Sequence, residues 1–225
     1  MSFENIGRHK LANGDCLEVM KQIPDGSIDL TVTSPPYDNL RTYNGTLNDW
    51  TPEKWQAIIR ELFRVTKQGG VVVWVVGDAT INGSETGTSF RQALYAMECG
   101  FRLHDTMIYQ TNKPPISGPR YQSQFEYMFV FSKNTPKSVN LLREETMHPG
   151  VRNSGGMRSK AGDMRKRTTE NRTGGTKARG NIWYMPRSSK SGDQFSKQHP
   201  ATFPEALARD HILSWSNPGD TVFDP

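Results

Sequence analysis

The sequence contains few cysteines and no long apolar run. Its two cysteines, Cys16 and Cys99, cannot form a disulfide framework or a zinc finger, and its five histidines lack the spacing of metal ligands. The longest apolar run, residues 71–76, is far too short to span a bilayer, and no signal peptide opens the sequence. We therefore expect an intracellular protein with no metal site and no membrane segment.

Hydrophobic residues are also scarce, at 34% of the 225 residues, which indicates that some segment is solvated. The net charge of +5 is unevenly distributed: residues 143–190 hold twelve basic and four acidic side chains, so the rest of the chain is net negative. This basic segment is poor in apolar residues and rich in Gly, Ser, Thr and Asn. It fits either a solvated or disordered insert, or an arm that pairs with nucleic-acid phosphates.

The segments on both sides show the apolar patterns of alternating strands and helices. Expected strands cover residues 28–33, 71–76, 101–110 and 125–132, with another that begins at residue 221. We expect helices that begin at Asp15, Thr51 and Ser89, a stop for the second one at Gly69-Gly70, and a fourth helix over residues 204–216. The predicted core faces of these four helices are, in order, Leu17, Met20 and Ile23; Trp55, Ile58, Ile59, Leu62 and Phe63; Phe90, Leu94 and Met97; and Ala208, Ile212 and Trp215. Such alternation predicts a doubly wound α/β fold, with ligands at the carboxyl ends of its strands.

The residues Ser34-Pro35-Pro36-Tyr37 follow the expected strand 28–33, at the edge where this architecture binds ligands. Two consecutive prolines fix backbone φ and remove two N–H donors. A rigid turn would therefore present a serine hydroxyl, carbonyl oxygens and an aromatic ring. Oxygen acceptors suit a planar amine, and the ring suits a stacked base. The alternative interpretation is a proline turn beside a core tyrosine.

The segments 13–17 (Asn-Gly-Asp-Cys-Leu) and 28–37, which ends in Ser-Pro-Pro-Tyr, resemble the opening of beta-class DNA amino-methyltransferases. That family methylates N4 of cytosine or N6 of adenine with S-adenosylmethionine. Its permuted order places the catalytic motif first, then a target-recognition region, then the cofactor motifs. Residues 199–204 resemble the helix-opening cofactor motif, and residues 221–225 resemble the start of the glycine-rich cofactor strand.

The resemblance implies a Rossmann-like, S-adenosylmethionine-dependent methyltransferase fold with a mostly parallel sheet and a basic insert. Residues 1–133 would form the catalytic half, 134–198 the basic target-recognition region, and 199–225 the start of the cofactor-binding half. The family's glycine-rich loop and acidic ribose-binding strand would follow Pro225, where the sequence ends. We therefore expect weakened cofactor binding by these residues alone.

By the same resemblance, the Ser34 hydroxyl and the Pro35 carbonyl accept hydrogen bonds from the target amine, and Pro36 and Tyr37 complete the catalytic motif. The base would be flipped out of the duplex and stacked against Tyr37. The implied cofactor-binding residues are Asp15, His199, Pro200, Thr202, Phe223, Asp224 and Pro225. Helix capping explains Asp15 equally well, and Asp78 fits either the cofactor pocket or a loop cap. The implied DNA-binding residues are Arg158, Lys160, Arg165, Lys166, Arg167, Arg172, Lys177 and Arg179.

A serine in the first motif position resembles the cytosine-N4 branch, and adenine-N6 is the alternative. A truncated or inactive DNA-binding module and an RNA or protein methyltransferase are rival functions. The resemblance implies double-stranded DNA as partner and the cytoplasm of a bacterium, or of a cell infected by a phage, as location. It leaves a homodimer and a cognate restriction endonuclease open.

Overall fold

The computed structural model describes residues 3–38, 50–112, 119–145, 156–166, 175–186 and 204–225. Contacts divide the chain into two compact units. Met1–Asn140 and Asn181–Pro225 form the first, and Leu141–Gly180 form the second. The separate unit is thus shorter than the recognition region expected at 134–198, because a strand at 182–184 joins the sheet of the first unit.

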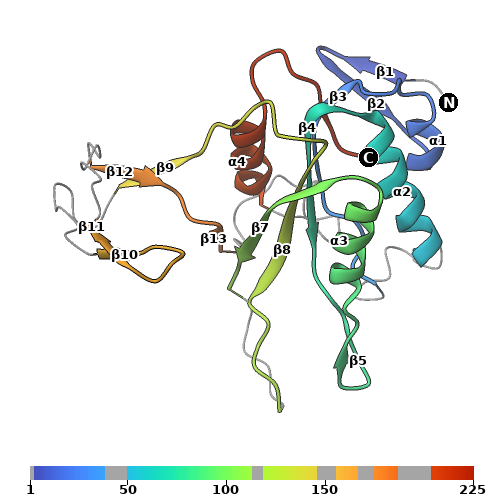
Figure 1. Ribbon diagram of the computed structural model, residues 1–225. Coiled ribbons are helices and arrows are strands. Elements are labelled where there is room, and N and C mark those ends of the chain that lie inside the picture. Colours follow the sequence, from blue (N-terminus) through green and yellow to red (C-terminus); the bar gives the residue numbers. More distant parts are fainter. Residues whose placement is uncertain (1–2, 39–49, 113–118, 146–155, 167–174, 187–203) are drawn as a thin grey trace. The chain divides into compact units, whose positions relative to one another are not determined.

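A six-stranded sheet forms the centre of the first unit (Figure 1). In spatial order its strands are β13 (Ile182–Tyr184), β7 (Arg102–Gln110), β8 (Phe125–Ser132), β4 (Thr66–Val76), β3 (Ile28–Thr33) and β14 (Val222–Phe223). β8 pairs antiparallel with both its neighbours, and the other three pairings are parallel. Five strands therefore share one direction and β8 alone runs against them, which confirms the predicted α/β fold with a mostly parallel sheet.

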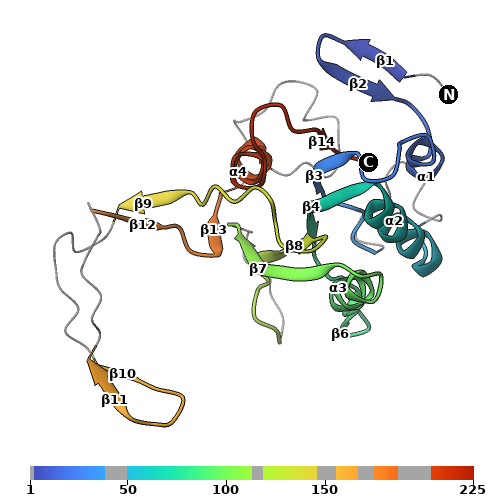
Figure 2. The same cartoon turned by 45° about the horizontal axis from the view of Figure 1, so that its top comes forward.

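Helices cover both faces of this sheet. On one face, α2 (Pro52–Val65) and α3 (Thr88–Glu98) share a core with the side chains of Val72, Trp74 and Phe129. α1 (Cys16–Met20) packs against α2. α4 (Glu205–Trp215) contacts β3 and, through His211, Met128 on β8. Figure 2 shows α4 on the opposite side of the sheet from α2 and α3. Because successive side chains of a strand point to opposite faces, the apolar run of β4 supplies both cores.

The helix α2 begins and ends through threonine side chains. Thr51 caps it by accepting a hydrogen bond from the amide of Lys54 (3.3 Å), as predicted, and Pro52 occupies the first turn. The helix ends at Val65, because the backbone of Thr66 is extended, with φ −70° and ψ 131°; the Thr66 amide and hydroxyl both donate to the carbonyl of Leu62. The predicted stop at Gly69-Gly70 is wrong: both glycines lie inside β4. A Cβ on Gly70 would lie 2.7 Å from Thr66 Cγ2 and 3.1 Å from the Asp29 carbonyl oxygen, so this close approach requires glycine.

The predicted core face of α3 is also wrong, and that of α4 is confirmed only for Trp215, which is buried. In α3, Phe90, Leu94 and Met97 are 50%, 60% and 45% exposed, and the buried face is Thr88, Ser89, Gln92, Ala93 and Ala96. Small side chains let the helix approach the sheet, where buried Gln92 accepts a hydrogen bond from Trp74 Nε1 (2.8 Å). In α4, Ala208 and Ile212 are only half-buried. His211 is fully buried instead, stacked on Trp183 with ring centroids 4.6 Å apart.

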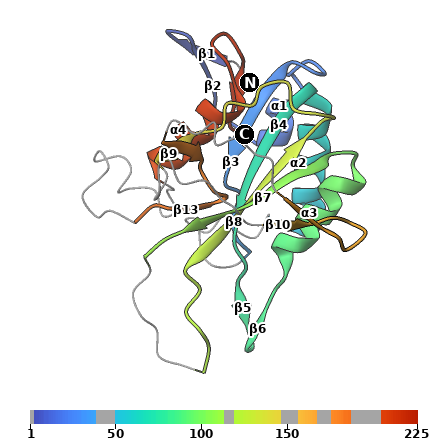
Figure 3. The same cartoon turned by 60° about the vertical axis from the view of Figure 1, so that its left-hand side comes forward.

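Small two-stranded sheets complete the described part of the chain. β1 (Phe3–Ile6) pairs with β2 (His9–Ala12), and β5 (Thr80–Ile81) pairs with β6 (Ser84–Glu85) just beyond the carboxyl end of β4 (Figure 3). In the second unit, β9 (Arg143–Glu145) pairs with β12 (Thr176–Ala178), and β10 (Gly156–Arg158) pairs with β11 (Met164–Lys166). None of the described helices is both long and apolar enough to cross a membrane.

Candidate active site

The predicted motif Ser34–Tyr37 lies at the carboxyl end of β3, as expected. β3 pairs with β4 as far as Thr33, and with β14 through Thr31 and Phe223. Pro35 is buried, while Ser34 and Tyr37 are half-buried. The parallel pairing brings the end of β14, where the cofactor motif was predicted to begin, to the same edge of the sheet.

A chain of hydrogen bonds joins the serine to a buried carboxylate. Ser34 Oγ lies 3.0 Å from the Tyr37 hydroxyl oxygen. The Tyr37 hydroxyl donates to Glu126 Oε2 at 2.9 Å. Glu126 stands in β8, the reversed strand, which begins at this edge of the sheet, and it is only 7% exposed. The arrangement holds the two polar groups of the motif in a defined orientation.

Gly77 makes room for the Tyr37 ring at the end of β4. A Cβ built on Gly77 would lie 3.4 and 3.5 Å from Tyr37 Cδ2 and Cε2, and 3.7 Å from Glu126 Cγ. These distances place the Tyr37 ring and the Glu126 side chain beside Gly77, the residue that follows β4. A side chain larger than alanine would therefore push the ring out of its place.

Asp38, which follows the motif, and Asp78, which follows β4, accept hydrogen bonds from the segment that leads into α3 and from its first turn. Asp38 has φ 44°, a left-handed conformation that aspartate tolerates, and its Oδ2 accepts a hydrogen bond from Thr86 Oγ1 (2.6 Å). Asp78 accepts from the Ser89 amide (2.9 Å) and hydroxyl (2.5 Å). The prediction that Ser89 caps α3 is wrong, because the N-cap is Gly87. Asp78 instead accepts the hydrogen bond of the Ser89 amide, one of the first-turn amides that have no acceptor within the helix. Between the two alternatives for Asp78, the capping interpretation is the one these contacts support.

The start of β14 is fastened to β3. Asp29 Oδ2 accepts hydrogen bonds from the Thr221 amide (2.9 Å) and from Lys67 Nζ (2.6 Å). Burial tends to raise the pKa of Asp29, but these two bonds and the charge of Lys67 together hold it below its usual value. At the end of the strand, desolvation by surrounding protein atoms raises the pKa of Asp224, and a hydrogen bond from Thr33 opposes that effect.

The remaining predicted cofactor residues are less well supported. Asp15 caps α1 by accepting from the Leu17 amide (2.9 Å), and it forms an ion pair with Lys54, which holds the pKa of Asp15 below its usual value. The capping role is therefore observed, and the cofactor contact of Asp15 stays a prediction. Phe223 is half-buried, and Pro225 ends the described chain. The predicted residues His199, Pro200 and Thr202 lie outside the described residues.

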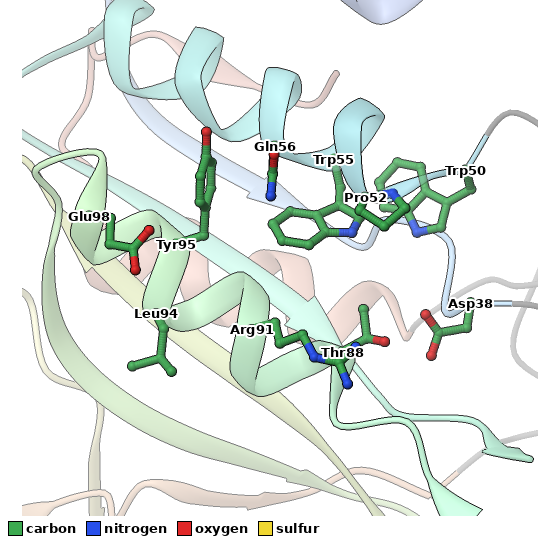
Figure 4. A pocket seen from close by; sticks show the side chains of 10 residues that line it. All are labelled: Asp38, Trp50, Pro52, Trp55, Gln56, Thr88, Arg91, Leu94, Tyr95 and Glu98. Carbon is green, nitrogen blue, oxygen red and sulfur yellow. The ribbon is translucent and has the colours of Figure 1, made fainter.

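An open pocket of about 370 Å³ lies between α2 and α3 and begins at Asp38, one residue beyond the motif (Figure 4). Trp50 and Trp55 form one side, and Arg91, Leu94 and Tyr95 of α3 form the other. Neither Ser34 nor Tyr37 lines it. It is thus a neighbour of the motif and does not include it.

The predicted DNA-binding residues lie partly in the second unit as described. Arg158 and Lys160 are exposed at and after the end of β10. Lys177 is also exposed and pairs with Glu144 across β9 and β12 (3.0 Å), whereas Arg179 is half-buried and its amide donates to the Leu142 carbonyl. Arg165 and Lys166 stand in β11, and the predicted residues Arg167 and Arg172 lie outside the described residues.

The fold and the proline-locked motif at the carboxyl edge of its sheet, which has one reversed strand, define the class of protein to which this chain belongs. A family model for N6/N4 methyltransferases, described as DNA methylase, matches residues 28–225, and the chain belongs to this family. The predicted assignment to the DNA amino-methyltransferases of the N4-cytosine or N6-adenine type is therefore confirmed.

Individual relatives agree with this assignment. The chain is 52% identical to the orphan methyltransferase M.BamHII of Bacillus amyloliquefaciens over 213 residues, which cover 91% of this chain and 78% of the relative. It is 27% identical to the DNA adenine methyltransferase YhdJ of Escherichia coli K12, over 96% and 70% of the two chains.

Solved structures share the fold. The cytosine-N4-specific PvuII DNA methyltransferase superposes with a TM-score of 0.65 at 20% identity, over 94% of this chain and 71% of that one. A protein of Thermus thermophilus, solved in complex with S-adenosyl-L-methionine, superposes with a TM-score of 0.57 at 24% identity, over 94% and 76%.

Two buried acidic residues of the sheet were not among the predicted site residues: Glu126, at the carboxyl edge, and Asp29, at the opposite end of β3. Glu126 is the single charged side chain of β8, and Asp29 is the single charged side chain of β3. A lone carboxylate inside an apolar strand is costly to bury without partners. That pattern, visible in the sequence, could have marked both residues.

Proposed function

We propose that this DNA methyltransferase acts on the exocyclic amine of a base flipped out of duplex DNA, with N4 of cytosine as the favoured target, and that Ser34 and the Pro35 carbonyl accept hydrogen bonds from that amine. One observation carries the proposal. The half-buried Ser34–Tyr37 corner and the end of β14 lie at the carboxyl ends of two paired parallel strands. An acceptor pair and the start of a cofactor site are thereby adjacent.

The role proposed for Ser34 and the Pro35 carbonyl follows from the electronic structure of the amine. Its lone pair is delocalised into the ring, which makes the nitrogen a weak nucleophile. Two oxygen acceptors that hold its N–H groups favour a tetrahedral nitrogen and stabilise the positive charge that develops on it. The prolines keep these oxygens in place, so little reorganisation is needed when the base arrives.

The described end of β14 fits S-adenosylmethionine in its charge. This group supplies an electrophilic methyl on a sulfonium when bound. Asp224, which is hydrogen-bonded to Thr33, follows the end of β14. Desolvation raises the pKa of its carboxyl group, and a ligand that carries positive charge would favour the ionised form. The predicted helix-opening residues His199, Pro200 and Thr202 would complete the site.

Recognition of DNA is assigned to the basic segment. Arg158 and Lys160 are exposed in the second unit and can reach phosphates without first breaking a described ion pair. Lys177 would have to exchange Glu144 for a phosphate. Arg165, Lys166, Arg167, Arg172 and Arg179 are the further predicted contacts. Phosphate contacts of this kind position the duplex, and base contacts would select the sequence.

The preference for cytosine over adenine as the target base is inferred from Ser34. Both amines can use the same acceptors, and the relatives and structural neighbours include proteins named for adenine and for cytosine-N4. The serine in the first motif position favours cytosine, and adenine-N6 is the alternative.

We extend the proposal to partners and location. Phe90, Leu94 and Met97 form an exposed apolar stripe along α3, which would suit a second copy of the chain. A cognate restriction endonuclease and a location in the bacterial cytoplasm are in keeping with relatives named Type II methyltransferases.

The test is methyl transfer from radiolabelled S-adenosylmethionine to unmethylated duplex DNA by the full-length protein, with RNA as competitor. The variant Ser34→Ala should lose at least about a hundredfold in rate. The matched control Ser84→Ala, on the exposed hairpin β5–β6, should keep its rate. Binding of DNA without any transfer by the unaltered protein would instead indicate a binding module, and label in RNA or protein would indicate the other rival function.

A further inference from the structure

The carboxylate of Glu126 is buried at the carboxyl edge of the sheet, and the proposed chemistry gives it no role. Glu126 is 7% exposed, and residues Met128 to Phe131 of the same strand are apolar and buried. Its Oε2 accepts the Tyr37 hydroxyl at 2.9 Å. Such a group is expensive to bury, so a contribution other than packing is expected of it.

The direction of the hydrogen bonds between Ser34, Tyr37 and Glu126 follows from which of these side chains carry a hydrogen to donate. A carboxylate oxygen has no hydrogen to give, so Tyr37 must donate to Glu126. A phenol has one hydrogen, and it is used in that bond. The contact between Ser34 Oγ and the Tyr37 oxygen, 3.0 Å long, therefore needs the hydrogen of Ser34. With its hydrogen turned to Tyr37, Ser34 presents lone pairs on its other side.

We propose that Glu126 is a positioning residue that acts through Tyr37 to fix the Ser34 hydroxyl as a hydrogen-bond acceptor for the target amine. This inference rests on the proposed function of Ser34. Without the carboxylate, the Tyr37 hydrogen can turn to Ser34, and the Ser34 hydrogen can then point at the amine. A donor that faces the N–H groups would repel them where an acceptor is required.

The chain of hydrogen bonds also strengthens as the reaction proceeds. Positive charge grows on the nitrogen, which polarises the bond to Ser34, and consecutive hydrogen bonds polarise one another. Glu126 puts a negative charge at the far end of this chain. Its contribution is therefore greater in the transition state than in the ground state, and kcat rather than the affinity for DNA should depend on it.

The experiment compares Glu126→Leu, Glu126→Gln and Tyr37→Phe in the full-length protein, with Glu4→Gln on the exposed strand β1 as control. Single-turnover transfer of label to unmethylated duplex DNA gives the rate, and calorimetry and filter binding give the affinities for S-adenosylmethionine and DNA. Thermal unfolding and circular dichroism identify any variant that does not fold. Glutamine keeps an acceptor oxygen for the Tyr37 hydrogen but carries no negative charge, so the rate of Glu126→Gln should lie between the rates of the unaltered protein and of Glu126→Leu.

We expect Glu126→Leu to lower the rate at least about tenfold with both affinities within about twofold. In the Ser34→Ala background, the same substitution should change the residual rate by less than about twofold, because its effect passes through Ser34. The pair Glu126→Leu and Tyr37→Phe should likewise be non-additive.

Two outcomes would overturn the inference. An unchanged rate in Glu126→Leu is one, and an equal loss with and without the Ser34 hydroxyl, which indicates a packing role, is the other. If Glu126→Leu fails to fold, Tyr37→Phe and Glu126→Gln decide, since full activity of Tyr37→Phe contradicts the chain of hydrogen bonds. Failure of the proposed function looks different, because the unaltered protein would then transfer no label at all.

Discussion

The Asp29 carboxylate accepts a hydrogen bond from the backbone amide of Thr221, 2.9 Å away, and so joins residues 192 positions apart in the sequence. The backbone reinforces the link, since the Thr221 carbonyl accepts from the amides of Asp29 and Leu30. β14 has only two residues, Val222 and Phe223, and Val222 is exposed. A strand this short needs such a fastening to keep its end beside the Ser34 corner.

Replacing Asp29 should loosen β14. The variant Asp29→Ala removes both the Thr221 and the Lys67 hydrogen bonds of a nearly buried carboxylate, so we expect the free energy of unfolding to fall by about 2 kcal/mol. Affinity for S-adenosylmethionine should fall with it. Urea unfolding followed by circular dichroism, and calorimetry, measure the two effects. Asp105→Asn on β7, which is not a neighbour of β14 in the sheet, is the control.

The same carboxylate predicts a pH dependence. Because the pKa of Asp29 in the folded protein lies below its usual value of 3.8, its contribution to stability is fully present above that value and is lost as the pH falls through the folded pKa. The difference in unfolding free energy between the unaltered protein and Asp29→Ala should therefore shrink on acidification below about pH 4. A difference that grows as the pH falls there would contradict the assigned pairing.

Gly77 should tolerate alanine but not valine. A Cβ at this position makes ordinary contacts with the Tyr37 ring at 3.4 and 3.5 Å, whereas the further methyl groups of valine have no room. We expect Gly77→Ala to keep transfer within about threefold, and Gly77→Val to lower it at least about tenfold by moving Tyr37 away from Ser34. Single-turnover rates measure this. Equal rates in both variants would show that the place of the Tyr37 ring is unimportant.

The basic segment should control the salt dependence of DNA binding. For the double variant Arg158→Gln with Lys160→Gln, the slope of log affinity against log salt concentration should become shallower by about 0.9 for each phosphate that is no longer neutralised. Fluorescence anisotropy with duplex DNA at several salt concentrations gives the slope. Lys10→Gln on β2 removes one exposed charge of the first unit and should leave it unchanged. A slope unaffected by the double variant would count against the assigned role of these two residues.

Most of the sheet could be predicted because its strands are encoded locally. Residues 28–33 and 125–132 form β3 and β8 with the expected bounds, since their apolar runs leave few alternatives. The buried face of α3 could not be predicted in this way. It is built from Ser89, Gln92 and two alanines, because close packing and the hydrogen bond to Trp74 outweigh hydrophobicity there.

The site was only half predictable for a similar reason. Ser34–Tyr37 form a contiguous motif, so the sequence displays them together. Glu126 reaches Tyr37 from 89 positions away, and only the register of β8 against its neighbours brings the two side chains together. Asp15 and Asp78 were ambiguous because capping and ligand binding favour the same residue type, and only hydrogen-bond partners distinguish them.

The central claim is that the Ser34 corner holds an exocyclic amine of a DNA base for methylation. Its most direct test is mass spectrometry of nucleosides from DNA that the full-length protein has methylated, beside DNA treated with Ser34→Ala. We predict N4-methylcytosine, reduced at least about a hundredfold by the substitution. N6-methyladenine with the same loss would correct the base and keep the mechanism. Methylation of a ring carbon, or amine methylation that persists in Ser34→Ala, would contradict the role proposed for Ser34.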